Sequence, residues 1–83
     1  MKLLYFAWVR TKVGRTSEQL EPPASVTTVA ALLDWLKTLS PRHADALADL
    51  ARVRVAVNQD YVTLDHPVMA TDEVAIFPPV TGG

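Results

Sequence analysis

The chain contains no cysteine among its 83 residues. Disulfide bonds and thiolate metal sites are therefore excluded. An excess of one charge is also lacking, because eight Lys and Arg residues against nine Asp and Glu residues give a net charge of −1. With no basic stripe, we expect no nucleic acid partner. Stability must come from packing, with which the 49% of hydrophobic residues is compatible.

Long apolar runs are absent as well. No stretch approaches the roughly 20 apolar residues that span a bilayer, and no clean cleavage site of a signal peptide follows the short run at residues 3–9. We therefore expect a cytoplasmic protein that does not engage a membrane. The length suits one small domain, and no repeat, linker or low-complexity tract divides it.

Histidine and serine form no pattern typical of a reactive site. His43 shares a predicted short helix with Asp45 and Asp49, but their spacing does not suit convergent metal ligands. We therefore expect His43 on a solvated helix face, and no metal site. No glycine-rich elbow or paired base activates a serine, and no glycine loop is present to bind phosphate.

Hydrophobic periodicity predicts an α+β domain over residues 1–77. In the first strand the core-facing set is expected to be Leu3, Tyr5, Ala7 and Val9. Thr27 or Thr28 is expected to cap a helix with an apolar stripe of Val29, Leu32, Leu33, Leu36 and Leu39, and Ser40-Pro41 to open a shorter one. Strands are expected at residues 2–10, 15–21, 52–58, 61–64 and 73–77. This order predicts a small mixed sheet of four to five strands with one main helix on one face.

The second face of that sheet has no helix to cover it. Phe6 and Trp8, together with Phe77, would then lie near water, which predicts a partner surface. The alternatives are that Phe6 and Trp8 lie beneath a loop or the short helix, and that Phe77 belongs to the core. Arg10 is either an interface anchor or a solvated charge. Tyr61 is expected to be partly buried, and Arg52 and Arg54 to be exposed.

The segment 78–83 differs from the rest of the chain. Its two prolines cannot donate to a sheet and favour an extended conformation. Its two glycines have no Cβ and can pass through a narrow channel. The segment can reach on the order of 20 Å, at about 3.3 Å per residue, so it predicts a carboxylate presented to another molecule; the alternative is a frayed terminus. Its residues are Pro78, Pro79, Val80, Thr81, Gly82 and Gly83.

These features resemble the β-grasp, ubiquitin-like sulfur carriers, and most closely the small-subunit family of molybdopterin synthase. The resemblance covers most of the chain in the expected order. Two positions depart from the family pattern: Thr71 stands where glycine is frequent, and Trp8 where a polar residue is common. The matching segments are residues 4–7 with Arg10, then 28–32, 55–59, and 72–83.

The resemblance implies a subunit that is not an enzyme on its own and works in a heterotetramer with a large synthase subunit. An ATP-dependent activating enzyme would adenylate Gly83, and a sulfur donor protein would supply the sulfur that replaces AMP as a thiocarboxylate. That sulfur would pass to cyclic pyranopterin monophosphate in molybdenum cofactor biosynthesis. ATP would be bound by the activating enzyme, and no cofactor held stably by this chain. The implied docking residues are Phe6, Trp8, Arg10, Tyr61 and Phe77.

Three other functions remain open. The same activation chemistry serves a ubiquitin-like modifier that is joined to target lysines, and also a sulfur carrier for thiazole synthesis. The third is a β-grasp binding module whose tail is idle.

Overall fold

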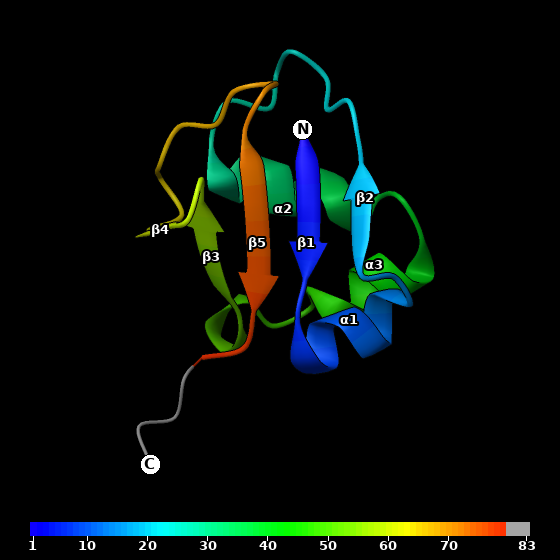
Figure 1. Cartoon of the computed structure of the whole chain (residues 1–83). Helices are drawn as coiled ribbons and strands as arrows, with labels where there is room; N and C mark the ends of the chain where they lie inside the picture. The colour runs from blue at the N-terminus through cyan, green and yellow to red at the C-terminus, as the bar shows by residue number, and fades with distance from the viewer. Residues whose placement is uncertain (80–83) are drawn as a thin grey trace.

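The computed structural model describes residues 1–79, so the predictions for residues 80–83 lie outside the described residues. Five strands form one mixed sheet in the order β2-β1-β5-β3-β4 (Figure 1). The central strand β5 is parallel to β1 and antiparallel to β3, and both edge pairs are antiparallel. The strands are β1 (Lys2–Tyr5), β2 (Ser17–Gln19), β3 (Arg54–Val57), β4 (Asp60–Val62) and β5 (Glu73–Phe77).

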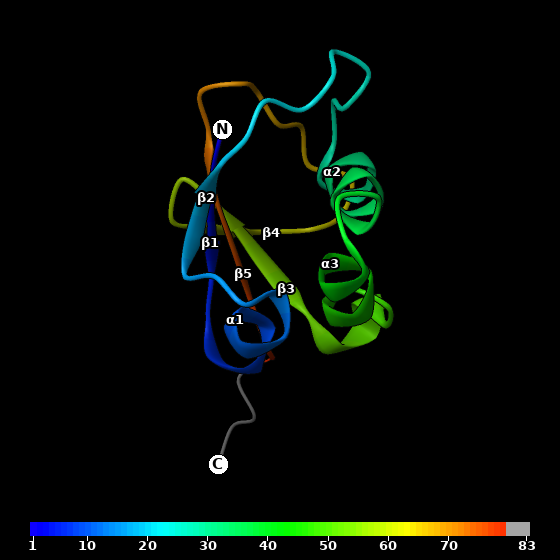
Figure 2. The same cartoon turned by 90° about the vertical axis from the view of Figure 1, so that its right-hand side faces the viewer.

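Three α-helices and one 3₁₀ turn complete the described part of the chain. They are α1 (Ala7–Val13), α2 (Val29–Lys37), α3 (Pro41–Ala46) and η1 (Leu50–Arg52). Figure 2 shows α2 and α3 on one side of the sheet, and no helix of residues 1–79 covers the other side. The predicted α+β, β-grasp arrangement is therefore confirmed, with α1 as an addition. No helix within residues 1–79 is both long enough and apolar enough to cross a bilayer.

The first strand was predicted to run to residue 10, but the observed strand β1 ends at Tyr5 and the chain then enters α1. Ala7 takes a positive φ of 53°, which turns the chain sharply, and Gly14 ends the helix in the left-handed region, as its predicted turn role requires. Tyr5, Val9 and Val13 are all buried at a spacing of four residues. A continuous apolar run carries both the strand and the helix period, and tertiary packing decides between them. Ala7 is exposed, contrary to the prediction.

The two helix starts follow the sequence prediction. The Thr28 hydroxyl accepts a hydrogen bond from the Ala31 amide at 3.2 Å, and Ser40 caps α3 with Pro41 in its first turn. Leu39, predicted as part of the α2 stripe, lies beyond the helix end and is 39% exposed. The stripe therefore stops one turn earlier than predicted.

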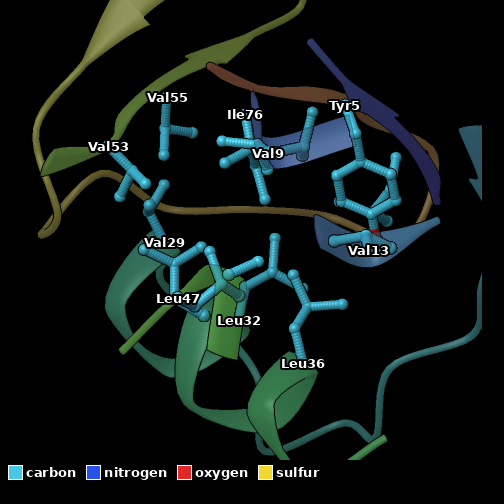
Figure 3. Close-up of a cluster of buried hydrophobic side chains, with 14 of the residues drawn as sticks. Tyr5, Val9, Val13, Val29, Leu32, Leu36, Leu47, Val53, Val55 and Ile76 are labelled. Atoms are coloured by element: carbon cyan, nitrogen blue, oxygen red, sulfur yellow. The ribbon is translucent and has the colours of Figure 1, made fainter. Parts of the chain in front are cut away.

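The core lies between the sheet and the layer formed by α2 and α3 (Figure 3). Each core strand contributes alternate residues, which is the periodicity of a half-buried sheet. Burying side chains of this size contributes about 1.5–3 kcal/mol each. The fully buried members include Leu3, Tyr5, Val9, Val29, Leu32, Leu33, Leu36, Leu47, Val74 and Ile76.

Candidate functional site: the tail root and the open face of the sheet

The root of the tail is the end of the central strand. Phe77, the last residue of β5, pairs with Arg54 of β3, and the Phe6 amide donates to the Ile76 carbonyl at 3.1 Å. Pro78 and Pro79 follow, half-buried and without backbone donors. The chain therefore leaves the sheet from its middle, at the end where α1 lies (Figure 1). The predicted end of the domain at Phe77 coincides with the end of β5.

The uncovered face of the sheet carries an apolar row that runs across four strands. Leu4 pairs with Ala75, Ala75 with Ala56, and Ala56 with Tyr61, so these four side chains share one face. We call this row, together with Phe6 and Phe77 at its tail end, the open face. Ala56 is only 5% exposed, so the other members make up the accessible part of the open face. An apolar surface that no element of residues 1–79 covers is typical of a binding surface.

Aromatic side chains gather where the open face meets the tail root. The rings of Tyr61 and Phe77 lie 5.5 Å apart at an interplanar angle of 41°. With Arg54 they line a cavity of about 190 Å³. Phe6 is 48% exposed and Tyr61 is 79% exposed. The partial burial predicted for Tyr61 is wrong, because β4 is a three-residue edge strand and no element of the described residues packs over that side of it.

Trp8 and Arg10, the other two predicted docking residues, lie on α1 and not on a strand. Arg10 is exposed and Trp8 is half-buried. The structure therefore divides the predicted set into three residues on the open face and two on the helix beside the tail root. Arg52 and Arg54 are both exposed as predicted, but Arg52 belongs to η1 and not to a strand. Its guanidinium carbon lies 5.4 Å from the Trp8 ring centroid.

His43 is not on a solvated face, as the sequence predicted, but is only 5% exposed. Its Nε2 lies 2.7 Å from Glu18 Oε2 on β2, and its Nδ1 lies 2.7 Å from the Ser40 hydroxyl. The Tyr5 hydroxyl donates to the same Glu18 oxygen at 2.7 Å. The sequence held a signal for this burial, since His43 shares one helix face with Ala46 and Leu47, which are also buried.

This polar cluster connects β1, β2 and α3, and burial together with its hydrogen bonds shifts the pKa values of Tyr5 and Glu18. Burial by itself would raise the pKa of the Glu18 carboxyl, but the hydrogen bonds from His43 and Tyr5 outweigh it and lower that pKa. Burial, followed by the bond to Glu18, raises the pKa of the Tyr5 hydroxyl. Ser40 Oγ accepts from the His43 amide at 3.2 Å as the cap of α3. We therefore assign the cluster a structural role.

Within residues 1–79 the structure contains no group of three or more His, Asp or Glu side chains that could hold a metal ion. The features that remain as a candidate site are the end of β5, the open face, and Trp8 and Arg10 of α1. Together they define a β-grasp protein whose central strand leads into a proline pair beside an apolar surface that no helix of residues 1–79 covers.

Comparison with known proteins identifies the family. Residues 3–83 match the ThiS family. The sulfur carrier subunit of molybdopterin synthase from Escherichia coli (strain K12) is 47% identical over 83 residues, covering 100% of this chain and 99% of that protein. The human protein of the same name is 34% identical over 87 residues, covering 100% and 93%. The chain therefore belongs to the ThiS family, and its relatives include sulfur carrier subunits of molybdopterin synthase.

Two solved structures show the same fold. A candidate subunit 1 of a molybdopterin converting factor from Pyrococcus furiosus superposes with a TM-score of 0.77 at 32% identity, covering 95% of each chain. Small archaeal modifier protein 1 of Haloferax volcanii superposes with a TM-score of 0.78 at 25% identity, covering 96% of this chain and 97% of that one.

Proposed function

We propose that this chain is the sulfur carrier of a molybdopterin synthase and that Gly83 is the residue that carries the sulfur. The observation on which the proposal rests is the end of β5. A central strand, held on both sides, leads directly into a proline pair beside an uncovered apolar face. The 47% identity to a sulfur carrier subunit over the whole chain supports the same function.

The chemistry requires activation of the terminal carboxylate. A carboxylate with a pKa near about 3.5 is ionised at neutral pH and is a poor electrophile. Its oxygen attacks the α-phosphate of ATP in a separate activating enzyme, and pyrophosphate leaves. A sulfur nucleophile at the oxidation level of sulfide then adds to the acyl carbon and AMP leaves, which yields the thiocarboxylate. Glycine at this position leaves the acyl carbon open to attack.

The partners meet the open face and the neighbouring surface of α1. Tyr61, Phe77 and Phe6 supply aromatic area next to the tail root, and aromatic residues dominate the binding energy of interfaces. Trp8 and Arg10 extend this surface. We propose that the activating enzyme and the large synthase subunit use it in turn, since each must take up the same tail. In the synthase the thiocarboxylate gives its sulfur to cyclic pyranopterin monophosphate.

The experiment is coexpression with a candidate activating enzyme and a sulfur source, followed by intact-mass analysis. The expected product is heavier by the replacement of one oxygen by sulfur, and a variant that lacks Gly83 stays unmodified. Reconstitution with a candidate large subunit should then produce molybdopterin with the full-length carrier and not with the variant that lacks Gly83. A chain that remains the unmodified acid when an authentic carrier is converted in parallel would refute the proposal.

A second candidate function is protein modification, favoured by the fold match to a small archaeal modifier protein. In that case the activated Gly83 would form an amide bond with a lysine of a target protein. Immunoblots of cells that express a tagged chain would then show conjugates of higher mass that disappear when Gly83 is deleted.

A further inference from the structure

A cleft of about 270 Å³ lies at the root of the tail. Three segments that are far apart in the sequence form it: Trp8 comes from α1, Ala51 and Arg52 from η1, and Pro78 and Pro79 from the start of the tail. We call Pro78 and Pro79 the neck. The cleft is separate from the open face, whose aromatic cavity is lined by Tyr61 and Phe77.

The parallel pairing of β1 and β5 brings Trp8 to the neck. Parallel strands end at the same edge of a sheet, so the segment after β1 and the segment after β5 start side by side. The bond from the Phe6 amide to the Ile76 carbonyl fixes this junction. Trp8 is the second residue of α1, which begins at Ala7 shortly after the end of β1. Pro78 follows the end of the neighbouring strand β5.

Arg52 reaches the same place from the other side. Strand β3 is antiparallel to β5, so it begins where β5 ends, and η1 immediately precedes it. The Arg52 guanidinium carbon lies 5.4 Å from the Trp8 ring centroid, and Lys12 Nζ lies 5.8 Å from it. A cation over an indole face at such distances is attracted by the negative potential of the ring, so Arg52 and Trp8 stabilise each other's position.

The neck must be held in place by side-chain contacts, because its backbone has no N–H group that could donate a hydrogen bond. Neither Pro78 nor Pro79 has an N–H, so neither can extend the ladder between β5 and its neighbours. Both are nevertheless half-buried. In the described part of the chain, the side chains that line the cleft with them are Trp8, Ala51 and Arg52.

We infer that Trp8 and Arg52 are positioning residues that hold the proline neck as one wall of this cleft and so set the direction in which the tail leaves the domain. The inference rests on the proposed function and adds a role for Arg52, which is outside the docking set. A fixed neck reduces the conformational freedom that must be lost when Gly83 enters a partner's active site. Preorganisation of this kind improves binding without a new contact.

The contact itself is tested on the isolated full-length chain by NMR. The wild-type protein should show nuclear Overhauser effects between the indole protons of Trp8 and the ring protons of Pro78 and Pro79. Arg52→Ala should weaken them, and Arg52→Lys, which keeps a cation, should retain more of them. Lys37→Ala removes one positive charge from α2 and is the matched control. Absence of these effects in the wild type would overturn the inference, whether or not the chain carries sulfur.

The consequence is tested in the activation assay with the same variants. Arg52→Ala should raise KM for the carrier about three- to tenfold while kcat changes by less than about twofold, since a positioning residue acts on binding and not on the chemical step. Arg52→Lys should recover part of the loss, and the melting temperature of each variant serves to show that it is folded at the temperature of the assay. Trp8→Phe provides a second variant that keeps an aromatic ring.

The two proposals fail in different ways. If no variant and no wild-type chain forms a thiocarboxylate, the proposed function is refuted while the NMR contacts still test the cleft. If the wild type is converted but Arg52→Ala matches Lys37→Ala in KM and in its NMR contacts, the cleft has no positioning role.

Discussion

Glu18 Oε2 lies 2.7 Å from His43 Nε2, although 25 residues separate the two positions in the sequence. Their side chains are 8% and 7% exposed, and this contact joins the edge strand β2 to α3. The same oxygen accepts from the Tyr5 hydroxyl, so one carboxylate satisfies two buried donors. Stability should therefore depend on the charge state of Glu18.

Glu18 predicts acid sensitivity. Its pKa is lowered in the folded chain, so its contribution to stability is complete above its ordinary value of 4.5 and is lost as the pH falls through the folded value. The free energy of unfolding, measured with urea between pH 7 and pH 3, should decrease in the acid part of this range. Glu18→Gln should be less stable at pH 7 and should have a flatter profile below pH 4.5. A profile parallel to that of the wild type would contradict this assignment.

The Tyr5 hydroxyl should contribute measurably to stability. Tyr5→Phe removes one hydrogen bond to a buried carboxylate and should reduce the free energy of unfolding by about 1.5–3 kcal/mol. Tyr61→Phe removes the same atom from a side chain that is 79% exposed, and it should change stability by less than about 0.5 kcal/mol. Thermal unfolding of both variants at pH 7 compares the two sites. Equal melting temperatures would show that the Tyr5 bond is not used.

Gly14 should not tolerate a side chain. Its φ is +86°, and a Cβ there would come within 2.9 Å of the Arg42 guanidinium carbon, which itself binds the Lys12 carbonyl through Nε at 3.0 Å. Gly14→Ala should therefore reduce the free energy of unfolding by more than about 1 kcal/mol, because it strains the backbone and also displaces the Arg42 side chain. Ala24→Gly is the reverse change at an exposed loop position, and it should reduce the free energy of unfolding by less. Denaturant midpoints measure both.

The open face should carry partner affinity and little stability. Tyr61→Ala should weaken binding to the large synthase subunit by about tenfold or more, the loss typical of a central aromatic residue in an interface. Met69 is 70% exposed but lies in the loop before the opposite end of β5, so Met69→Ala is the control. Calorimetric titrations give both affinities. If the two variants bind equally well, Tyr61 is not a docking residue.

The sequence predicted the elements whose signals are local. Ser40 was recognisable as a cap, the other cap was narrowed to Thr27 or Thr28, and the proline pair after Phe77 marked the end of β5, because each signal depends only on near neighbours. The apolar run through Trp8 fitted both a strand and a helix. Only the packing of Val9 and Val13 into the core decides that it is α1.

Two features of the structure depend on long-range pairing and were not predictable in this way. The burial of His43 has a local signal in Ala46 and Leu47, but its partner Glu18 lies 25 residues away and has none. The contact of Arg52 with Trp8 requires both the parallel pairing of β1 with β5 and the antiparallel pairing of β3 with β5. By contrast, Phe6 and Phe77 were correctly predicted to lie toward the uncovered side, whereas Trp8, predicted with them, lies on α1.

The central place of β5 has a mechanical consequence. It is the only strand that joins the β2-β1 pair to the β3-β4 pair among the described residues. A pull on the tail therefore loads two hydrogen-bonded ladders along their length instead of peeling one strand from a rim. The strand that leads into the neck is thus also the one that would have to yield before the sheet could split, which suits the proposed carrier, whose tail must be drawn into a partner and released again.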